Sequence, residues 1–593
     1  MAGNRFFLLD TYQNIKHKLP SYVLKSIIRL FPIYLISSFF ELFGLFILFP
    51  VIKIIIEPGI IQENKYVNFL YVKLNFHNNI SFVLFLFCTV TILFVLKNFF
   101  IYLISKKQIT VAFKMASRLS LEKYNSYLSK PYSFHANNNT AVLLRNFTQM
   151  PFDLIQYLVL PFIAIINESF ILLLIVATIT FYDPLLFLSL IVSMAPFLFI
   201  YNRIYKKRLS AISARRDEES AYMFKLGLQS MEAFREIAVF NKSGYFKPIY
   251  KKTVDRFSKS VSEAYLINTI SPKFVETVAV LAIFSIFISG YLLNKDLAAL
   301  AQFLIIFAIA AFRIIPSLNK IILFSNYIKT SSYIFQHFEA TNEYNSEEER
   351  KKSGTSQEEI KFTDNLELKN LSFTFENKKE SVLNNLNLTI KKGDTIGIIG
   401  SSGSGKSTLL NILLRLYQEQ TGGIYIDGNK IEKANLSAWY KLVSYVPQNI
   451  TLLDGSIIEN IAFGIVRSDI DQNLLAKVIK QSQLEPFINE LPDGANTQIG
   501  EKGIKISGGQ RQRIGIARAL YHGGKILIFD EATSSLDTET EEMLTESINN
   551  ISHQELTIII VAHRIQTLKY CDAIYKLESG AIKSDSIDQL DAL

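Results

Sequence analysis

A glycine-rich stretch with a single lysine has the residue types and spacing of a phosphate-binding loop. Residues 400–408 read GSSGSGKST, which fits the pattern G-x-x-x-x-G-K-S/T, and they follow the apolar run 395–399 directly. Backbone N–H groups of such a loop converge on phosphate oxygens, and the helix expected after it favours negative charge at its N-terminus. We expect Lys406 to meet the β and γ phosphates of a nucleotide and the Ser407 hydroxyl to hold Mg²⁺. The predicted nucleotide-binding residues of this loop are Gly400, Ser401, Ser402, Gly403, Ser404, Gly405, Lys406, Ser407 and Thr408.

Two adjacent carboxylates follow a second apolar run, residues 526–529. Asp530, at the end of this predicted buried strand, is suited to bind Mg²⁺ directly or through water. Glu531 is suited to orient and polarise an attacking water. Two ordinary acids at a strand end would give the same pattern, but their combination with a complete phosphate loop favours a catalytic role.

A third polar stretch, Ser507-Gly508-Gly509-Gln510, lies upstream of these acids and opens a predicted helix over 511–520. Ser507 has the side chain of an N-cap, and the two glycines allow close approach of an anion. Taken alone, this pattern would indicate an ordinary helix start.

Apolar stretches before residue 327 predict a membrane domain in front of these motifs. A helix needs roughly 20 apolar residues to span a bilayer. Six stretches reach or approach this length, namely residues 30–56, 82–104, 158–181, 185–205, 265–293 and 297–327. We predict an α-helical membrane domain of six transmembrane helices with long cytoplasmic extensions, over residues 1–338. A charged linker follows over 339–361, and an α/β phosphate-loop domain over 362–593.

The net charge of +9 is carried largely by the gaps between these stretches. Basic residues concentrate in the two long gaps, 105–157 and 206–264, which places those gaps and both termini in the cytoplasm. Each gap has helical spacing and a reversal, near 131–135 and 229–234, that would form either a solvated hairpin or a contact with the phosphate-loop domain. Nucleic-acid binding is excluded because no basic–aromatic stripe accompanies the charge. Cys88 and Cys571 lie in different parts of the chain and do not suggest a disulfide.

The order and spacing of these motifs resemble the nucleotide-binding domain of an ABC transporter. The six-span part resembles the membrane domain of ABC exporters in its layout. The resemblance implies ATP hydrolysis coupled to transport, with ATP and Mg²⁺ as cofactors. It also implies that Phe375 stacks on adenine, where the family more often has tyrosine. Gln448 matches the glutamine loop, which senses Mg²⁺ and the membrane domain.

Three more segments match the family in the same way. Residues 506–510 match the signature, with isoleucine in place of the usual leucine, so that Ser507, Gly508, Gly509 and Gln510 would contact ATP. Asp537 matches the D-loop, and His563 matches the switch histidine near the γ phosphate. Residues 498–503 resemble a segment found in exporters, which disfavours an importer.

One phosphate loop and one signature imply a dimer, because in this family the signature of one domain completes the site of the other. A homodimer with two competent sites is the simplest arrangement. A heterodimer with a degenerate partner is the alternative.

The cargo is predicted from weaker similarities. Residues 37–50, 139–146 and 312–320 resemble bacterial exporters that flip lipid-linked oligosaccharides. This implies a polyprenyl-linked glycan crossing the bacterial cytoplasmic membrane. A general lipid, drug or peptide exporter is the alternative, and a non-transporting regulatory ATPase is a third reading that the six spans disfavour.

Charged residues inside the predicted spans are the candidate substrate contacts, because such charges are costly and usually functional. Arg313, Lys320, Lys97 and Lys53 could meet a pyrophosphate. They could equally pair with Glu41, Glu168 or Glu276, or extend to the interface. The outward segment 66–76 is predicted to form a short helix on the membrane surface, which would either engage a polyprenyl tail or serve as a packing lid.

Overall fold

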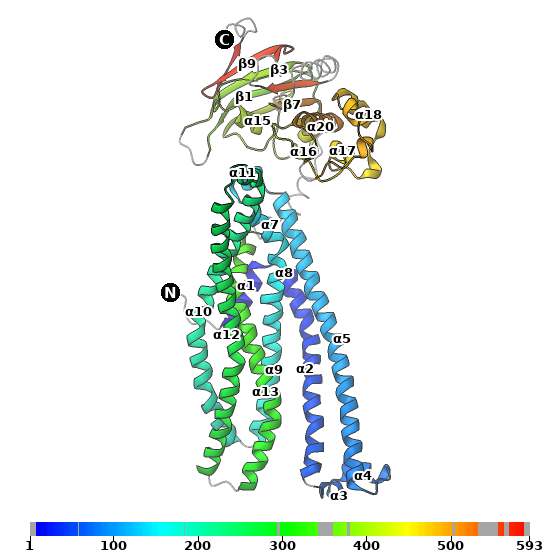
Figure 1. Cartoon of the computed structure of the whole chain (residues 1–593), viewed down its shortest axis with the longest axis vertical. Coiled ribbons are helices and arrows are strands. Elements are labelled where there is room, and N and C mark those ends of the chain that lie inside the picture. Colours follow the sequence, from blue (N-terminus) through cyan, green and yellow to red (C-terminus); the bar gives the residue numbers. More distant parts are fainter. Residues whose placement is uncertain are drawn as a thin grey trace. The chain divides into compact units, whose positions relative to one another are not determined.

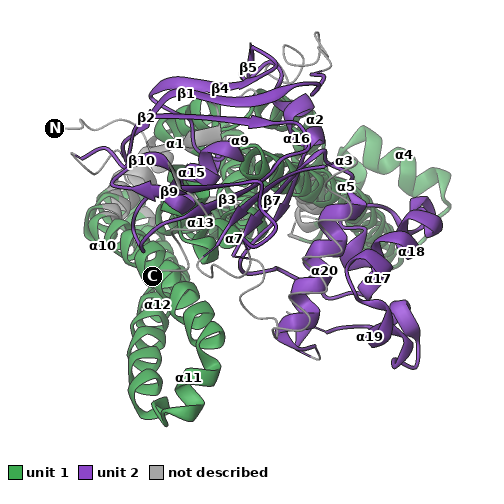
Figure 2. Ribbon diagram, turned by 90° about the horizontal axis from the view of Figure 1, so that it is seen from above, with its two compact units in different colours: residues 1–130, 134–346 green, residues 131–133, 347–593 purple. Residues whose placement is uncertain are grey.

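A computed structural model describes residues 7–56, 58–182, 184–292, 297–341, 360–375, 380–500, 503–504, 506–531, 556–562 and 568–585. These residues form two compact units, one of residues 1–130 and 134–346 and the other of residues 131–133 and 347–593 (Figure 2). Most of the predicted linker, residues 342–359, lies outside the described part of the chain. The boundaries of the predicted domains therefore stay predictions.

The first unit consists of long helices, because its apolar stretches contain few glycines and the prolines are far apart. The long elements are α2 (Ser21–Ile56), α5 (Asn79–Leu128), α9 (Leu160–Tyr182), α10 (Pro184–Glu232), α12 (Ser243–Leu292) and α13 (Leu297–Ser331). A π-helical turn, η1 (Ile155–Val159), runs into α9. Together these elements cover almost all of the six predicted spans. Within the described residues, four stretches are long and apolar enough to cross a membrane: Ser21–Gly44, Asn79–Leu128, Met150–Ala177 and Ser243–Leu292.

Short helices precede, connect and follow the long ones (Figure 1). They are α1 (Phe7–Lys18), α3 (Ile60–Glu63), α4 (Lys65–Lys73), α6 (Tyr132–Asn137), α7 (Thr140–Thr148), α8 (Met150–Leu154), α11 (Phe234–Val239) and the 3₁₀ helix η2 (Ser332–Thr341). The predicted reversals fall at α6 and at the turn from α10 into α11. The predicted outward segment contains α4, whose N-cap Asn64 accepts a hydrogen bond from the Tyr66 N–H at 3.0 Å.

The second unit contains two sheets. An antiparallel sheet has the order β2-β1-β4-β5, formed by β1 (Asn365–Phe373), β2 (Leu383–Lys391), β4 (Thr421–Ile426) and β5 (Asn429–Lys430). The other sheet has the order β10-β9-β3-β8-β7-β6, formed by β3 (Thr395–Ile399), β6 (Val443–Val446), β7 (Ile526–Asp530), β8 (Thr557–Val561), β9 (Ala573–Glu578) and β10 (Ala581–Asp585). All its pairs are parallel except β9 with β10.

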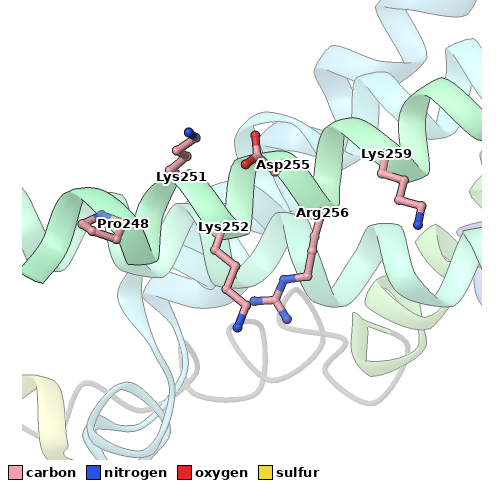
Figure 3. A pocket seen from close by; sticks show the side chains of 6 residues that line it. All are labelled: Pro248, Lys251, Lys252, Asp255, Arg256 and Lys259. Carbon is pink, nitrogen blue, oxygen red and sulfur yellow. The ribbon is translucent and has the colours of Figure 1, made fainter.

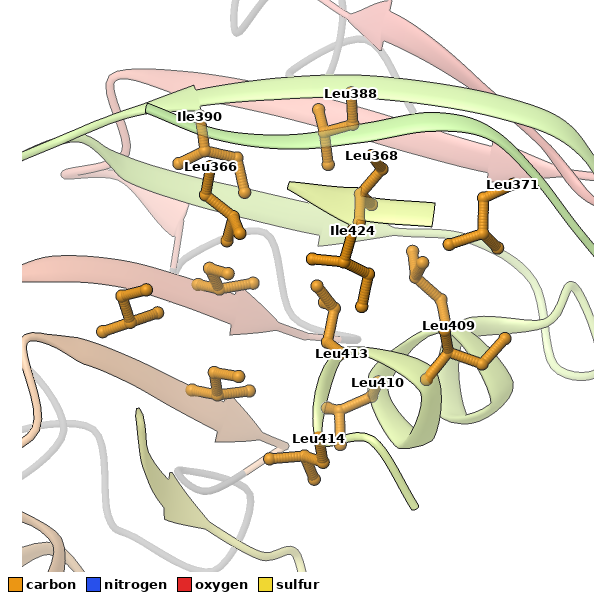
Figure 4. Close-up of a cluster of buried hydrophobic side chains, with 14 of the residues drawn as sticks. Leu366, Leu368, Leu371, Leu388, Ile390, Leu409, Leu410, Leu413, Leu414 and Ile424 are labelled. Atoms are coloured by element: carbon orange, nitrogen blue, oxygen red, sulfur yellow. The ribbon is translucent and has the colours of Figure 1, made fainter. Parts of the chain in front are cut away.

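Helices accompany these sheets, as parallel pairing requires crossover connections. They are α15 (Lys406–Leu413), α16 (Leu436–Leu442), α17 (Ile457–Ile461), α18 (Gln472–Gln481), α19 (Glu485–Asn489) and α20 (Gly508–Tyr521), with 3₁₀ turns η3 (Arg467–Asp469) and η4 (Gly494–Asn496). A buried leucine cluster holds α15 against the sheets, with Leu409 and Leu410 of the helix packed near Leu368 and Ile424 (Figure 4). This packing fixes the helix whose first residue is Lys406.

Candidate nucleotide-binding site

The predicted phosphate loop connects β3 to α15 and has backbone that only glycine adopts easily. Gly403 and Gly405 have φ angles of +83° and +106°, in the left-handed region that favours glycine. A Cβ built on Gly400 would lie 2.5 Å from the Leu577 carbonyl oxygen, so a side chain has no room there. The loop therefore exposes its backbone at the start of α15, as a phosphate-binding loop requires.

Lys406 folds back over this loop. Its Nζ donates hydrogen bonds to the carbonyl oxygens of Gly400 at 2.7 Å and Ser401 at 3.0 Å. Burial lowers the pKa of Lys406, and the nearby negative charge of Glu531 raises it. A phosphate is a stronger acceptor than two neutral carbonyls, so this ammonium group is well placed to exchange them for phosphate oxygens. Ser407 is exposed beside it, whereas Ser404 and Thr408 are buried.

The two predicted carboxylates lie at the carboxyl end of β7, two strands away from β3 in the same parallel sheet. Ligands of such sheets bind outside the carboxyl ends of the strands. Asp530 accepts a hydrogen bond from the Tyr445 hydroxyl at 3.2 Å. Burial raises the pKa of Asp530, the bond from Tyr445 lowers it, and the charge of Glu531 raises it. A divalent cation at this carboxylate would favour its ionised form.

Glu531 and Gln448 are in direct contact, although 83 residues separate them in the sequence. Gln448 Nε2 donates to Glu531 Oε2 at 2.6 Å. The backbone of Glu531 has a φ of +48°, which is unusual for a residue with a long side chain and often marks a functional position. Its N–H donates to the Val561 carbonyl oxygen at 2.9 Å, which ties the turn to β8. The structure thus brings two of the three predicted catalytic residues together.

Two aromatic side chains lie next to the predicted adenine contact. Phe375 is half-buried and lies edge-on to Phe373 at 5.0 Å and to Tyr417 at 5.7 Å between ring centroids. Sequence reasoning missed Tyr417 and Tyr445. The only signal for Tyr445 was its place in the strand immediately before Gln448.

The predicted signature begins α20 through a capping box. The Ser507 hydroxyl accepts from the Gln510 N–H at 3.2 Å, and the Gln510 side-chain oxygen accepts from the Ser507 N–H at 2.8 Å. These bonds order the helix start and leave Gly508 exposed at its tip. His563 and Asp537 lie outside the described residues, so their predicted roles stay predictions.

Two of the four predicted substrate contacts take part in an ion cluster within the helical unit. Arg313 pairs with Glu41 of α2 and with Glu168 of α9, the latter at 3.1 Å. Lys320 pairs with Glu168 at 2.7 Å, and the Ser317 hydroxyl donates to the same carboxylate at 2.7 Å. This agrees with the alternative that these cations are paired, except that Glu276 pairs with Lys273 of its own helix.

Of the other two candidates, only Lys97 has a described side chain. Lys97 lies over the Phe94 ring, 4.5 Å from its centroid. Lys53 belongs to α2, but its side chain lies outside the described part of the chain. A further basic surface, which the sequence did not single out, runs along α12, where Lys252 and Arg256 extend from the helix to the same side (Figure 3).

Comparison with known proteins places both units in one family. Residues 383–534 match the ABC transporter family, and residues 27–315 match the ABC transporter transmembrane region. An ATP-dependent lipid A-core flippase of Francisella tularensis subsp. tularensis is 28% identical over 79% of this chain and 76% of its own length. A protein of the same name from Pseudoalteromonas translucida is 43% identical over 37% of each chain.

Similarity extends to proteins with other names. The ABC multidrug transporter atrD of Emericella nidulans is 41% identical over 37% of this chain and 16% of its own length. In two of these three relatives, the match thus spans well under half of the relative's own length. The structure of a bacterial Atm1-family ABC exporter with ATP bound aligns with a TM-score of 0.76, at 18% identity, over 96% of this chain and 95% of that one. This likeness supports the fold.

Replacing Lys406 by methionine should abolish the loop's charge while keeping much of its side-chain volume. We expect ATP affinity to fall by about tenfold or more, because the ammonium group meets phosphate oxygens. Binding of a fluorescent ATP analogue by the purified protein measures this loss. The matched control is Lys391→Met at the exposed end of β2. Equal affinity in Lys406→Met and wild type would contradict the assignment.

Proposed function

This chain belongs to the ABC transporter family, and from that premise we propose that it hydrolyses ATP to export or flip a lipid-linked oligosaccharide or related glycolipid. The observation that carries the proposal is the union of two features in one chain. One is a complete phosphate loop, whose Lys406 is held by the Gly400 and Ser401 carbonyls, in the same unit as the bonded pair Gln448 and Glu531. The other is a set of membrane-length apolar helices.

The ATP site uses the residues at the carboxyl edge of the parallel sheet. Lys406 and the loop N–H groups would hold the phosphates, Ser407 and Asp530 would hold Mg²⁺ together with Gln448, and Phe375 would stack on the base. Glu531 orients the attacking water, and its bond to Gln448 fixes the carboxylate. His563 completes the γ-phosphate contacts. Mg²⁺ supplies charge neutralisation at the β and γ phosphates.

The working unit is a homodimer. The capping box satisfies Ser507 and Gln510 within α20, and the exposed helix tip is suited to face an anion on another molecule. With Asp537, the signature of each copy completes the ATP site of the other. The basic gaps and both termini face the cytoplasm, and the membrane is the bacterial cytoplasmic membrane.

Glu531→Gln should retain ATP binding but slow hydrolysis by about 100-fold or more, because the amide cannot polarise water as a carboxylate does. With ATP and Mg²⁺ the variant should accumulate as a closed dimer. Steady-state phosphate release and mass measurement in detergent check both parts. Near-normal turnover would refute the role of Glu531, and a monomer under these conditions would refute the homodimer.

The cargo proposal is supported by the ion cluster and by α4. Arg313 and Lys320 provide cations within apolar helices, suited to a phosphate-bearing headgroup. Helix α4 has no buried residues and exposes Tyr66 and Phe69, which suits contact with lipid chains at the membrane surface. Relatives named lipid A-core flippase are consistent with an amphiphilic glycolipid as cargo. The relative named as a multidrug transporter supports a general exporter as the second candidate.

Purified protein in liposomes separates these candidates. A polyprenyl diphosphate-linked oligosaccharide should stimulate ATP hydrolysis by about twofold or more and be flipped in an ATP-dependent way. This follows because cargo that fits the site lowers the barrier of the coupled cycle. The ATPase rate and protection of the lipid headgroup from an external enzyme are the measurements. Stimulation by hydrophobic drugs alone would establish the second candidate instead.

Substitution of the two carboxylates of the ion cluster should change different properties: lipid binding for Glu41 and protein stability for Glu168. Glu41 is 22% exposed and contacts only Arg313 in the cluster. Glu41→Gln should therefore leave two cations facing the single carboxylate of Glu168, so that the cluster gains one net positive charge. The half-stimulating concentration of the diphosphate lipid should then fall several-fold. Glu168 is 5% exposed and accepts three donors, so Glu168→Gln should destabilise the protein by about 3 to 5 kcal/mol. Lipid dose–response and thermal unfolding measure the pair. An unchanged dose–response in a stable Glu41→Gln variant would contradict this use of Arg313.

A further inference from the structure

We propose that Arg518 is a positioning residue that fastens the segment following Gln448 to helix α20. Through this attachment, one rigid element places both Gln448, at its own ATP site, and Ser507, at the site of the partner copy. The role of Ser507 in this statement rests on the proposed function. The attachment itself rests on contacts within the second unit.

The Arg518 guanidinium group makes three hydrogen bonds to residues before α20. Its Nε donates to the Asn460 carbonyl oxygen at 2.8 Å, and one terminal nitrogen donates to the Thr451 carbonyl oxygen at 3.0 Å. The other terminal nitrogen donates to Asn460 Oδ1 at 3.3 Å. A planar fork with fixed donors suits such a set of acceptors, whereas a lysine ammonium is a single point on a flexible stem.

Asn460 extends this attachment to the rest of the segment. It is fully buried, and its Oδ1 also accepts from the Leu453 N–H at 2.8 Å. Its Nδ2 donates to the carbonyl oxygens of Leu453 at 3.0 Å and Ser456 at 3.1 Å. Backbone groups of Thr451, Leu453 and Ser456 are therefore bound to Arg518 either directly or through the Asn460 side chain.

Ile450, the residue before Thr451, makes a second contact with the same face of α20. Gly515 lies three residues before Arg518, so both positions share one side of the helix. A Cβ built on Gly515 would lie 2.2 Å from Ile450 Cδ1 and 2.8 Å from its Cγ1. Ile450 thus packs directly on the helix backbone, and only glycine at position 515 allows this.

Between the end of β6 and the part attached to α20, only Pro447, Gln448 and Asn449 remain. Strand β6 ends at Val446, where it pairs with Phe529 of β7, and the fastened part begins at Ile450. Gln448 and Asn449 are exposed, and Gln448 reaches Glu531 at 2.6 Å. A displacement of α20 would move Ile450 and Thr451 with it, and so change the reach of Gln448 toward Glu531.

Arg518→Lys in the full chain, reconstituted in liposomes, tests this role. Because Gln448 is proposed to contact Mg²⁺, we expect the half-saturating Mg²⁺ concentration for hydrolysis to rise several-fold, and kcat to fall by about tenfold. The KM for ATP should change less than twofold. Gln448→Ala should give the same pattern, and the double variant should be no worse than Gln448→Ala alone, because both changes disturb one contact.

The matched control is Arg513→Lys, on the same helix. Arg513 donates to the Gln483 carbonyl oxygen at 2.8 Å and, among the described residues, forms no hydrogen bond with the segment after Gln448. It should leave the Mg²⁺ dependence unchanged. A merely structural role of Arg518 would lower the fraction of folded protein without moving the Mg²⁺ dependence, and its effect would add to that of Gln448→Ala. Either result overturns the proposal.

A second pair of variants keeps the test decisive if Arg518→Lys does not fold. Gly515→Ala should raise the half-saturating Mg²⁺ concentration by displacing Ile450, and adding Ile450→Ala should restore it by making room for the new methyl group. Failure of this rescue would count against the attachment. If wild-type protein hydrolyses ATP and neither variant set alters its Mg²⁺ dependence, only this inference falls. If wild-type protein does not hydrolyse ATP, the proposed function falls as well.

Discussion

The phosphate-binding site of the second unit depends on the hydrogen bonds that hold the buried ammonium group of Lys406 at the start of α15. Lys406 holds a positive charge where burial disfavours it, and the Gly400 and Ser401 carbonyls compensate only in part. The surrounding architecture serves to keep that charge in place. Glycines bring the backbone close, and leucines of α15 anchor the helix to the sheets. Glu531 follows the end of β7 in the same sheet, and its negative charge favours the charged form of Lys406.

Local patterns allowed much of this arrangement to be predicted. The strand, loop and helix around Lys406 follow from contiguous residues, and so do the long apolar helices. The contact of Gln448 with Glu531 was not predicted, because no local signal links residues 83 positions apart. Family resemblance singled out Gln448, and the strand-end pattern singled out Glu531. Tyr445 and Arg518 were not found at all. Tyr445 resembles an ordinary strand residue, and Arg518 binds mainly backbone carbonyls, which carry no trace in the sequence.

The ion cluster of the first unit illustrates a different limit. The charges within apolar stretches were detected, and Glu41 and Glu168 were named as possible partners for them. The choice between pairing and substrate contact stayed open, because the packing of α2 and α9 against α13 is not encoded in any short segment. The two acids balance the two bases, which lowers the cost of burying them. Because the formal charges of the cluster sum to zero, it attracts an anion only weakly until one carboxylate moves away from the two cations.

The length of α12 has a mechanical consequence. Its 50 residues extend for about 75 Å if the helix is continuous. A tilt of about 5° about one end of such a rod moves the other end by about 6 Å, slightly more than one helical turn. A helix of this length would convert a small tilt at one end into a displacement of about one helical turn at the other, and Pro248 and Pro272 mark the points at which it would bend.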